Sequence, residues 1–166
     1  MTPMQSGMRK VLCVTLLGVL SSVSHADALG DAMNARSRGD YAAAAVQFRQ
    51  LAATGNAPAA FQLSLLYANG QGVKADARES VRWLKMAAAG GDVPAQINLG
   101  VAYAKGRGVP QDDSRAYVWF AKAAGSGDSV AQTNRDIAAR KLSAQQLNQA
   151  NELLAQCQGP RLDACL

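Results

Sequence analysis

The sequence contains little of the chemistry on which most enzymes and metalloproteins depend. Its 166 residues include one histidine and three cysteines, only 5% are aromatic, and only 17% are charged. Because 49% of the residues are hydrophobic and recur with helical spacing, the chain is not expected to be disordered. A core with so few aromatic residues must be filled by small side chains, mostly alanine. This composition favours closely packed helices over a β-sandwich or β-barrel.

A concentrated positive charge is also missing. The formal net charge is +5, but Arg9 and Lys10 belong to the first ten residues, and without them 15 basic and 12 acidic residues remain. The remainder shows no basic cluster of the kind that binds phosphate backbones. We therefore expect no nucleic-acid partner.

The N-terminus has the three-part pattern of a secretory signal peptide. The basic pair Arg9-Lys10 precedes an uncharged, mostly apolar run, Val11–Val23, and Ser24-His25-Ala26 then offers small residues at positions −3 and −1. This run is shorter than the about 20 residues of a membrane span. We predict cleavage after Ala26 and a periplasmic or secreted protein, with residues 1–26 as the signal peptide. An uncleaved N-terminal membrane anchor is the alternative.

Cleavage would remove the only histidine, His25. A Ser-His-Asp or Cys-His mechanism and a histidine-ligated zinc site are then excluded, and we expect no catalytic residue, metal or cofactor. Cys157 and Cys165 would be the two remaining cysteines, with the turn-forming pair Gly159-Pro160 between them. In an oxidising compartment such a pair is typical of a disulfide. Two free thiols are the alternative.

A repeat with a period of 36 residues dominates the remaining chain. Residues 59–94 and 95–130 align without a gap, and the period lies in the range typical of solenoids. The identical pairs include Ala59/Ala95, Leu63/Leu99, Tyr67/Tyr103, Gly70/Gly106, Gly72/Gly108, Val73/Val109, Asp76/Asp112, Trp83/Trp119, Ala87/Ala123 and Gly91/Gly127.

Each repeat predicts two helices. The first begins after an N-cap at Asn56, Asp92 or Asp128 and ends near Asn69 or Lys105, before a Gly-x-Gly loop. The second begins after Asp76 or Asp112, and Asp76 with Glu79 predicts a capping box.

The segments on either side of the two repeats are predicted to be partial repeat units. Residues 27–58 form a helix pair with a shorter connection, in which Gly39 turns the chain and Asp40 caps the second helix. After Val130 the repeat fades, and Arg135 replaces the core leucine. Residues 131–166 are predicted to form a helical cap and tail, with Ser143 as the N-cap of a last helix. A more polar terminal unit keeps a solenoid soluble.

The pattern A-x-x-x-L-x-x-x-Y-x-x-G-x-G-V-x-x-D, followed by W and A-A-x-x-G-D, resembles the Sel1-like repeat, a relative of the tetratricopeptide repeat. The resemblance covers nearly all of the chain after residue 26. It implies an all-α fold, a right-handed α/α solenoid of helix pairs with a C-terminal capping helix.

The resemblance also implies a function: a non-enzymatic adaptor of the cell envelope or secreted space that binds a protein or peptide on its concave face. The alternative is a cell-wall enzyme or binder, because a cysteine-rich branch of the family is associated with β-lactam and peptidoglycan binding. That branch carries a cysteine pair in each repeat, whereas both central repeats here have none. Ser64, Ser80 and Ser114 are the available nucleophiles, and none stands in S-x-x-K or G-x-S-x-G.

Related solenoids line their concave face with the first helix of each pair. Gln62, Asn98 and Asn134 occupy non-core positions of these helices at successive offsets of 36. They are predicted to form a ladder of amide side chains that hydrogen-bonds an extended peptide or a glycan. The alternative is a row of solvated polar residues.

Overall fold

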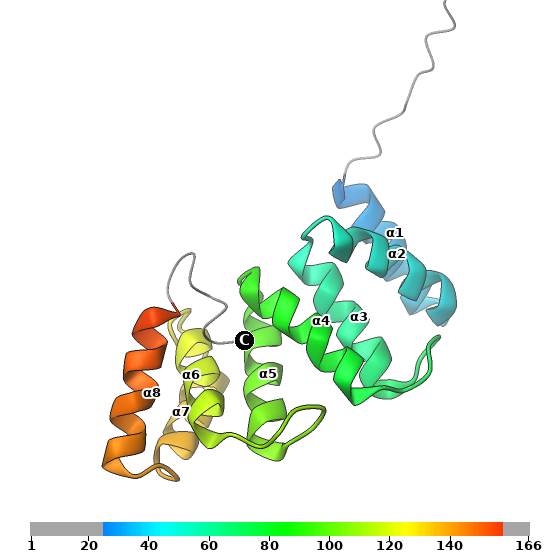
Figure 1. Ribbon diagram of the computed structural model, residues 1–166. Coiled ribbons are helices and arrows are strands. Elements are labelled where there is room, and N and C mark those ends of the chain that lie inside the picture. The colour runs from blue at the N-terminus through cyan, green and yellow to red at the C-terminus, as the bar shows by residue number, and fades with distance from the viewer. Residues whose placement is uncertain (1–24, 158–166) are drawn as a thin grey trace, which may run out of the picture.

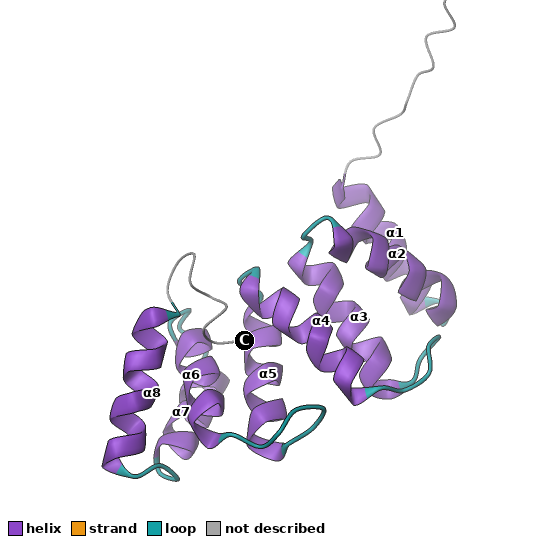
Figure 2. Cartoon of the chain, in the orientation of Figure 1, coloured by secondary structure: helices purple, strands orange, loops and turns teal. Residues whose placement is uncertain are grey.

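The computed structural model describes residues 25–157, so the predicted signal peptide lies almost entirely outside the described residues. Every regular element in this part of the chain is an α-helix, which confirms the all-α prediction (Figure 2). The helices are α1 His25–Ser37, α2 Tyr41–Ala53, α3 Ala57–Asn69, α4 Ala77–Ala89, α5 Val93–Lys105, α6 Asp113–Ala124, α7 Ser129–Ala139 and α8 Ala144–Gln156.

The helices stack one after another from α1 at one end to α8 at the other (Figure 1). Each helix from α1 to α6 packs against the next one along the chain. We call α1, α3, α5 and α7 the first helices and α2, α4 and α6 the second helices. The arrangement is a solenoid of helix pairs, as predicted.

Short-range sequence signals set where the helices begin. The side chain of the residue before each helix from α2 to α8 accepts a backbone N–H of the first turn, as N-cap residues do. Asn56 accepts from Ala59 at 2.9 Å, and Asp92 accepts from Ala95 at 2.8 Å. At the other ends of α3 and α5, Gly70 and Gly106 adopt left-handed conformations. The predicted ends at Asn69 and Lys105 are confirmed.

The predicted capping box at Asp76 and Glu79 is only half formed. Asp76 accepts backbone N–H groups from Arg78 at 2.8 Å and from Glu79 at 3.1 Å. Its own N–H, however, donates to the Tyr67 carbonyl at 3.0 Å, and the Glu79 carboxylate pairs with Arg82. The second hydrogen bond of a capping box, from the Asp76 N–H to the Glu79 carboxylate, therefore does not form. A complete capping box forms instead at Ser143 and Gln146.

The core runs through the stack and is built from small side chains between a few large ones. Leu63 and Leu99 are fully buried, as are Trp119 and Phe48. Alanines fill the space between them, and many of these are also completely buried. This confirms the expectation that neighbouring helices approach closely over an alanine-rich core.

The second glycine of each Gly-x-Gly loop lies against the unit before it. A Cβ at Gly72 would collide with the backbone of Tyr41, and a Cβ at Gly108 would collide with that of Ala77. Tyr41 and Ala77 are the first residues of α2 and α4. Both glycines also have positive φ, 69° and 74°. Each loop therefore stacks on the start of the preceding second helix, where only glycine fits.

Helix α8 closes the stack on α6 and does not pair closely with α7. The Tyr117 hydroxyl donates to Asn151 Oδ1 at 2.8 Å, and Lys122 Nζ donates to the Cys157 carbonyl at 3.0 Å. Val118 and Cys157 are buried in this contact region. The last helix is thus a cap over the final second helix. Cys165 lies outside the described residues, so the Cys157–Cys165 disulfide stays a prediction.

Alanine substitutions at two glycines distinguish the free-energy cost of a positive φ from the additional cost of a steric collision with the preceding unit. Gly91 has φ of 87° with nothing within 4 Å of an added Cβ, whereas Gly108 has φ of 74° and backbone in the way. Gly91→Ala is expected to cost about 1–2 kcal/mol of unfolding free energy. Gly108→Ala is expected to cost about 1–3 kcal/mol more, because the stacked units must separate. Urea denaturation followed by circular dichroism measures both, and equal costs would contradict the stacking role.

Substitutions of Asp92 measure the contributions of its N-cap hydrogen bond and of its charge to stability. Burial raises the pKa of the Asp92 carboxyl above its ordinary value, against the hydrogen bond from Ala95 N–H, which lowers it. Asp92→Ala should cost about 1 kcal/mol, whereas Asp92→Asn should keep the cap, as Asn56 does.

The stability of the wild type relative to Asp92→Asn should depend on pH. The folded state binds a proton at Asp92 more tightly than the unfolded chain, so wild-type stability falls as pH rises from the ordinary to the raised pKa. The wild type should therefore lose stability relative to Asp92→Asn across that window. Denaturation curves at several pH values measure the difference, and the opposite slope would contradict the raised pKa.

Candidate partner-binding face

The three predicted amides occupy the same position on three successive first helices. Gln62 lies on α3, Asn98 on α5 and Asn134 on α7. Asn98 is exposed, and Gln62 and Asn134 are half-buried. We call the surface formed by these helices the first-helix face.

Two of the amides already have partners within the chain. Arg36 Nη1, on α1, donates to Gln62 Oε1 at 2.7 Å. Asn98 Nδ2 donates to the Pro94 carbonyl of its own helix at 2.9 Å. A ligand must therefore replace these bonds in order to use the amides as a ladder.

Two hollows lie on the first-helix face, and they occupy equivalent places in successive units. The central hollow is formed by α3, α4 and α5, with Leu65, Leu84, Asn98 and Val101 in its lining. The C-terminal hollow is formed by α5, α6 and α7, with the equivalent residues Val101, Phe120, Asn134 and Ile137. Each member of the second set lies 36 residues after its counterpart in the first. Val101 lines both hollows.

The first unit contains a third, more polar version of the same place. The N-terminal hollow is lined by Met33, Arg36, Ser37, Tyr41 and Gln71. Because the connection between α1 and α2 is four residues shorter, residues of α1 correspond to those of α3 at an offset of 32. Arg36 thus takes the place of Ala68, a lining residue of the central hollow. The arginine covers part of this hollow and reaches Gln62.

An apolar stripe runs along the first-helix face beside the amides. It consists of one residue from each first helix, at equivalent positions: Met33, Leu65, Val101 and Ile137. Leu65 and Val101 are half-buried, while Met33 and Ile137 are 39% and 44% exposed. The sequence reasoning missed this stripe, although the period of 36 relates Leu65, Val101 and Ile137 directly. Leu65, Val101 and Ile137 each follow an amide by one turn, whereas Met33 follows Gly30.

The central and C-terminal hollows are small, whereas the N-terminal one measures about 370 Å³. The central one measures about 200 Å³ and the C-terminal one about 260 Å³. Sites for drug-sized ligands measure roughly 300–1,000 Å³. The size of these hollows suits one or two side chains of a longer ligand.

Comparison with known proteins assigns the repeat. The Sel1 repeat family model matches residues 57–92 and 93–128. Two consecutive segments at the centre of the chain are therefore similar to the Sel1 repeat. A comparison with curated proteins finds no match.

Two solved structures extend this similarity beyond the matched repeats. A protective antigen of uropathogenic Escherichia coli strains, displaying an SLR fold, is 31% identical with a TM-score of 0.75 over 86% of this chain. A Sel1 repeat protein from Oxalobacter formigenes is 28% identical with a TM-score of 0.63 over 81% of this chain. The chain spans 32% of the length of the antigen and 59% of the other protein. These likenesses support the Sel1-like repeat family, whose fold indicates a protein–protein interaction module.

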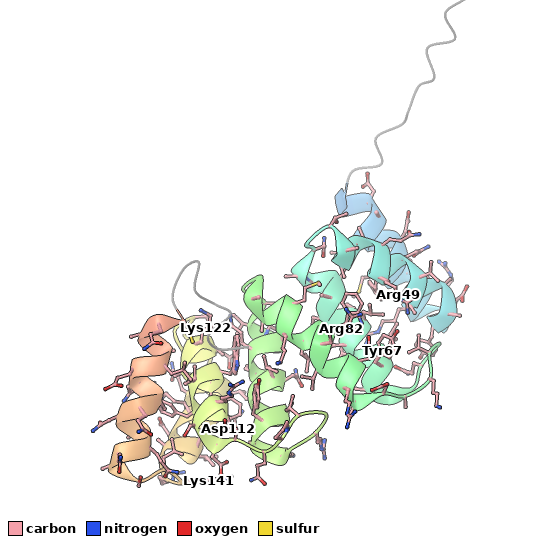
Figure 3. All side chains as sticks on the ribbon, viewed as in Figure 1. Arg49, Tyr67, Arg82, Asp112, Lys122 and Lys141 are labelled. Atoms are coloured by element: carbon pink, nitrogen blue, oxygen red, sulfur yellow. The ribbon has the colours of Figure 1, made fainter. Side chains whose placement is uncertain are left out.

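The aromatic residues of the Sel1 motif are structural in this chain. Arg49 Nη2, on α2, donates to the Tyr67 hydroxyl on α3 at 2.8 Å, and the two side chains point toward each other (Figure 3). One unit later, Lys85 Nζ lies 6.0 Å from the centre of the Tyr103 ring. Both contacts join a second helix to the first helix of the next unit. The tyrosines therefore hold neighbouring units together: Tyr67 joins the first unit to the first Sel1 repeat, and Tyr103 joins the two Sel1 repeats.

The candidate serine nucleophiles are engaged with the backbone or lie in a helix start. The Ser64 hydroxyl donates to the Phe61 carbonyl at 2.6 Å, and the Ser80 hydroxyl donates to the Ser64 carbonyl at 2.9 Å. Both residues are buried. Ser114 lies in the first turn of α6. The contacts of Ser64 and Ser80 serve the packing of α3 and α4 and give no base to activate a hydroxyl.

Residues 25–157 show neither a metal-binding cluster nor a membrane-spanning helix. No group of three or more His, Cys, Asp or Glu residues is placed there to hold a metal ion. Within the same range, no helix has both the length and the apolar character needed to cross a bilayer.

Proposed function

We propose that this protein is an exported adaptor module that binds a protein partner on its first-helix face. The observation that carries the proposal is the recurrence of the same hollow, with the same amide beside it, in successive units. A surface with this regularity presents similar contacts along a line, as an extended segment of another chain requires.

The Sel1 repeat fold supports the adaptor role, and the N-terminal pattern supports the cell envelope or the secreted space as its location. A cell-wall enzyme gains no support from the site, because the hydroxyls of Ser64 and Ser80 are committed to backbone carbonyls. The central and C-terminal hollows likewise lie below the usual size of a small-molecule site.

Affinity capture tests the proposed face. The purified protein should capture a defined partner from an envelope extract, and a triple variant, Gln62→Ala, Asn98→Ala and Asn134→Ala, should recover at least about tenfold less of it. Such a loss corresponds to about 1.4 kcal/mol of binding free energy.

A matched control changes three exposed amides of α8, Gln145→Ala, Asn148→Ala and Gln149→Ala. This variant should capture the partner as well as the wild type does. Equal recovery by the wild type and the first-helix variant would show that the partner binds elsewhere.

Export has a separate test. When the full chain is expressed in a Gram-negative host, the protein recovered from the periplasm should begin at Asp27 by N-terminal sequencing. Ala26→Arg should block this cleavage, because signal peptidase requires a small residue at position −1. A wild-type protein that keeps residues 1–26 and stays with the membrane would favour the anchored alternative.

A further inference from the structure

We infer that the first-helix face binds an extended acidic segment of its partner, with apolar side chains of that segment seated in the central and C-terminal hollows. This inference rests on the proposed function and adds the chemistry of the partner. Three features of the described residues carry it: the apolar lining of the hollows, the charge at their rims and the spacing between them.

The apolar lining calls for apolar side chains. Leu65, Val81 and Leu84 line the central hollow, and Phe120 and Ile137 line the C-terminal one. Val101 lies between the two and contributes to both. Ile137 remains 44% exposed although it is a large aliphatic residue. A leucine or similar side chain of a ligand would remove this surface from water in each hollow.

The charged residues around the hollows are mostly basic. Arg107 lines the central hollow, and Lys105 and Lys141 line the C-terminal one. The acidic member, Asp113, lies 3.5 Å from Lys141 and is partly neutralised by it. Helices α3 and α5 contain no Asp or Glu, and the acidic residue of α7, Asp136, is paired with Arg135 at 2.7 Å. The face is therefore complementary to carboxylates on either side of the apolar anchors.

The N-terminal hollow extends the same charge. Arg36 stands there in the place of an alanine, and its guanidinium is held by the neutral amide of Gln62 at 2.7 Å. A ligand carboxylate makes a stronger, charge-assisted bond to arginine than an amide oxygen does. Arg36 can therefore exchange Gln62 for an acidic residue of the ligand, which frees Gln62 for the ligand backbone.

A peptide fits this face better than a glycan. The backbone of an extended peptide offers an N–H and a C=O to the amides of Asn98 and Asn134, while alternate side chains turn toward the hollows. A glycan presents hydroxyl groups on most of its surface. Buried against Val101 and Phe120, these hydroxyls would lack partners.

The repeat also sets the spacing of the apolar anchors. Successive first helices are separated by an intervening second helix, and packed helices lie roughly 8–10 Å apart, so the two hollows are roughly 10–20 Å apart. An extended chain advances about 3.3 Å per residue. The two anchors should therefore be separated by about three to six residues.

Fluorescence anisotropy with synthetic peptides tests the inference directly. The probes are labelled 14-residue peptides of Glu, Ser and two Leu residues, with the leucines one to eight residues apart. Binding should be tightest at a separation of about three to six residues and should weaken as salt screens the charges. Replacing Glu by Gln, or both Leu by Ser, should weaken binding at least about tenfold.

Variants of the protein locate the binding. Lys105→Glu with Arg107→Glu should reduce affinity for the acidic peptide at least about tenfold, and Ile137→Ser should reduce it several-fold. The control, Arg38→Glu with Lys74→Glu, makes the same change of charge at exposed residues outside the hollows and should bind normally. Circular dichroism verifies that each variant remains folded.

Two outcomes would overturn the inference. One is equal binding of the Glu and Gln peptides, and the other is tighter binding of a soluble peptidoglycan fragment than of any peptide, with loss in the same variants. Either result, combined with partner capture that depends on Gln62, Asn98 and Asn134, would leave the proposed face intact. If capture is also unaffected by those three substitutions, the proposed function fails with it.

Discussion

The structure depends on one close approach, which recurs once in each Sel1 repeat. Gly72 and Gly108 lie so near the first residues of α2 and α4 that a Cβ would collide with the backbone there. This contact sets how each unit sits on the one before it. Side-chain contacts of two tyrosines stabilise the same junctions: Arg49 contacts Tyr67, and Lys85 contacts Tyr103. Because these junctions repeat, residues 36 positions apart in the sequence occupy equivalent positions in successive units.

That equivalence creates the candidate binding face. Residues with no role in the motif, such as Leu65, Val101 and Ile137, become a stripe because the stacking repeats. The hollows exist because first helices of successive units do not pack closely on each other, while a second helix lies between them. The basic rims then arise from Lys105, Arg107 and Lys141, which lie in or next to the helix ends. The hollows therefore have a similar shape in successive units, but the charged residues at their rims differ.

Much of the fold could be predicted from local residue patterns, because helix starts and stops are short-range events. The N-caps at Asn56 and Asp92 and the helix ends before Gly70 and Gly106 were predicted and are confirmed. The capping box at Asp76 failed for a non-local reason, since its N–H is taken by the Tyr67 carbonyl. The three amides were placed on the right helices, but the bond from Arg36 to Gln62 depends on the shorter first connection and was not foreseen.

The period, most helix bounds and the small-residue core follow from the residue pattern alone, because each depends on contacts along the chain or on a motif that repeats. The three-dimensional arrangement was needed to show that α8 packs on α6, that the Ser64 and Ser80 hydroxyls donate to backbone carbonyls, and that hollows open beside Asn98 and Asn134. These features arise where helices distant in sequence meet. Their geometry depends on the volumes and angles of packed side chains, which a one-dimensional pattern does not contain.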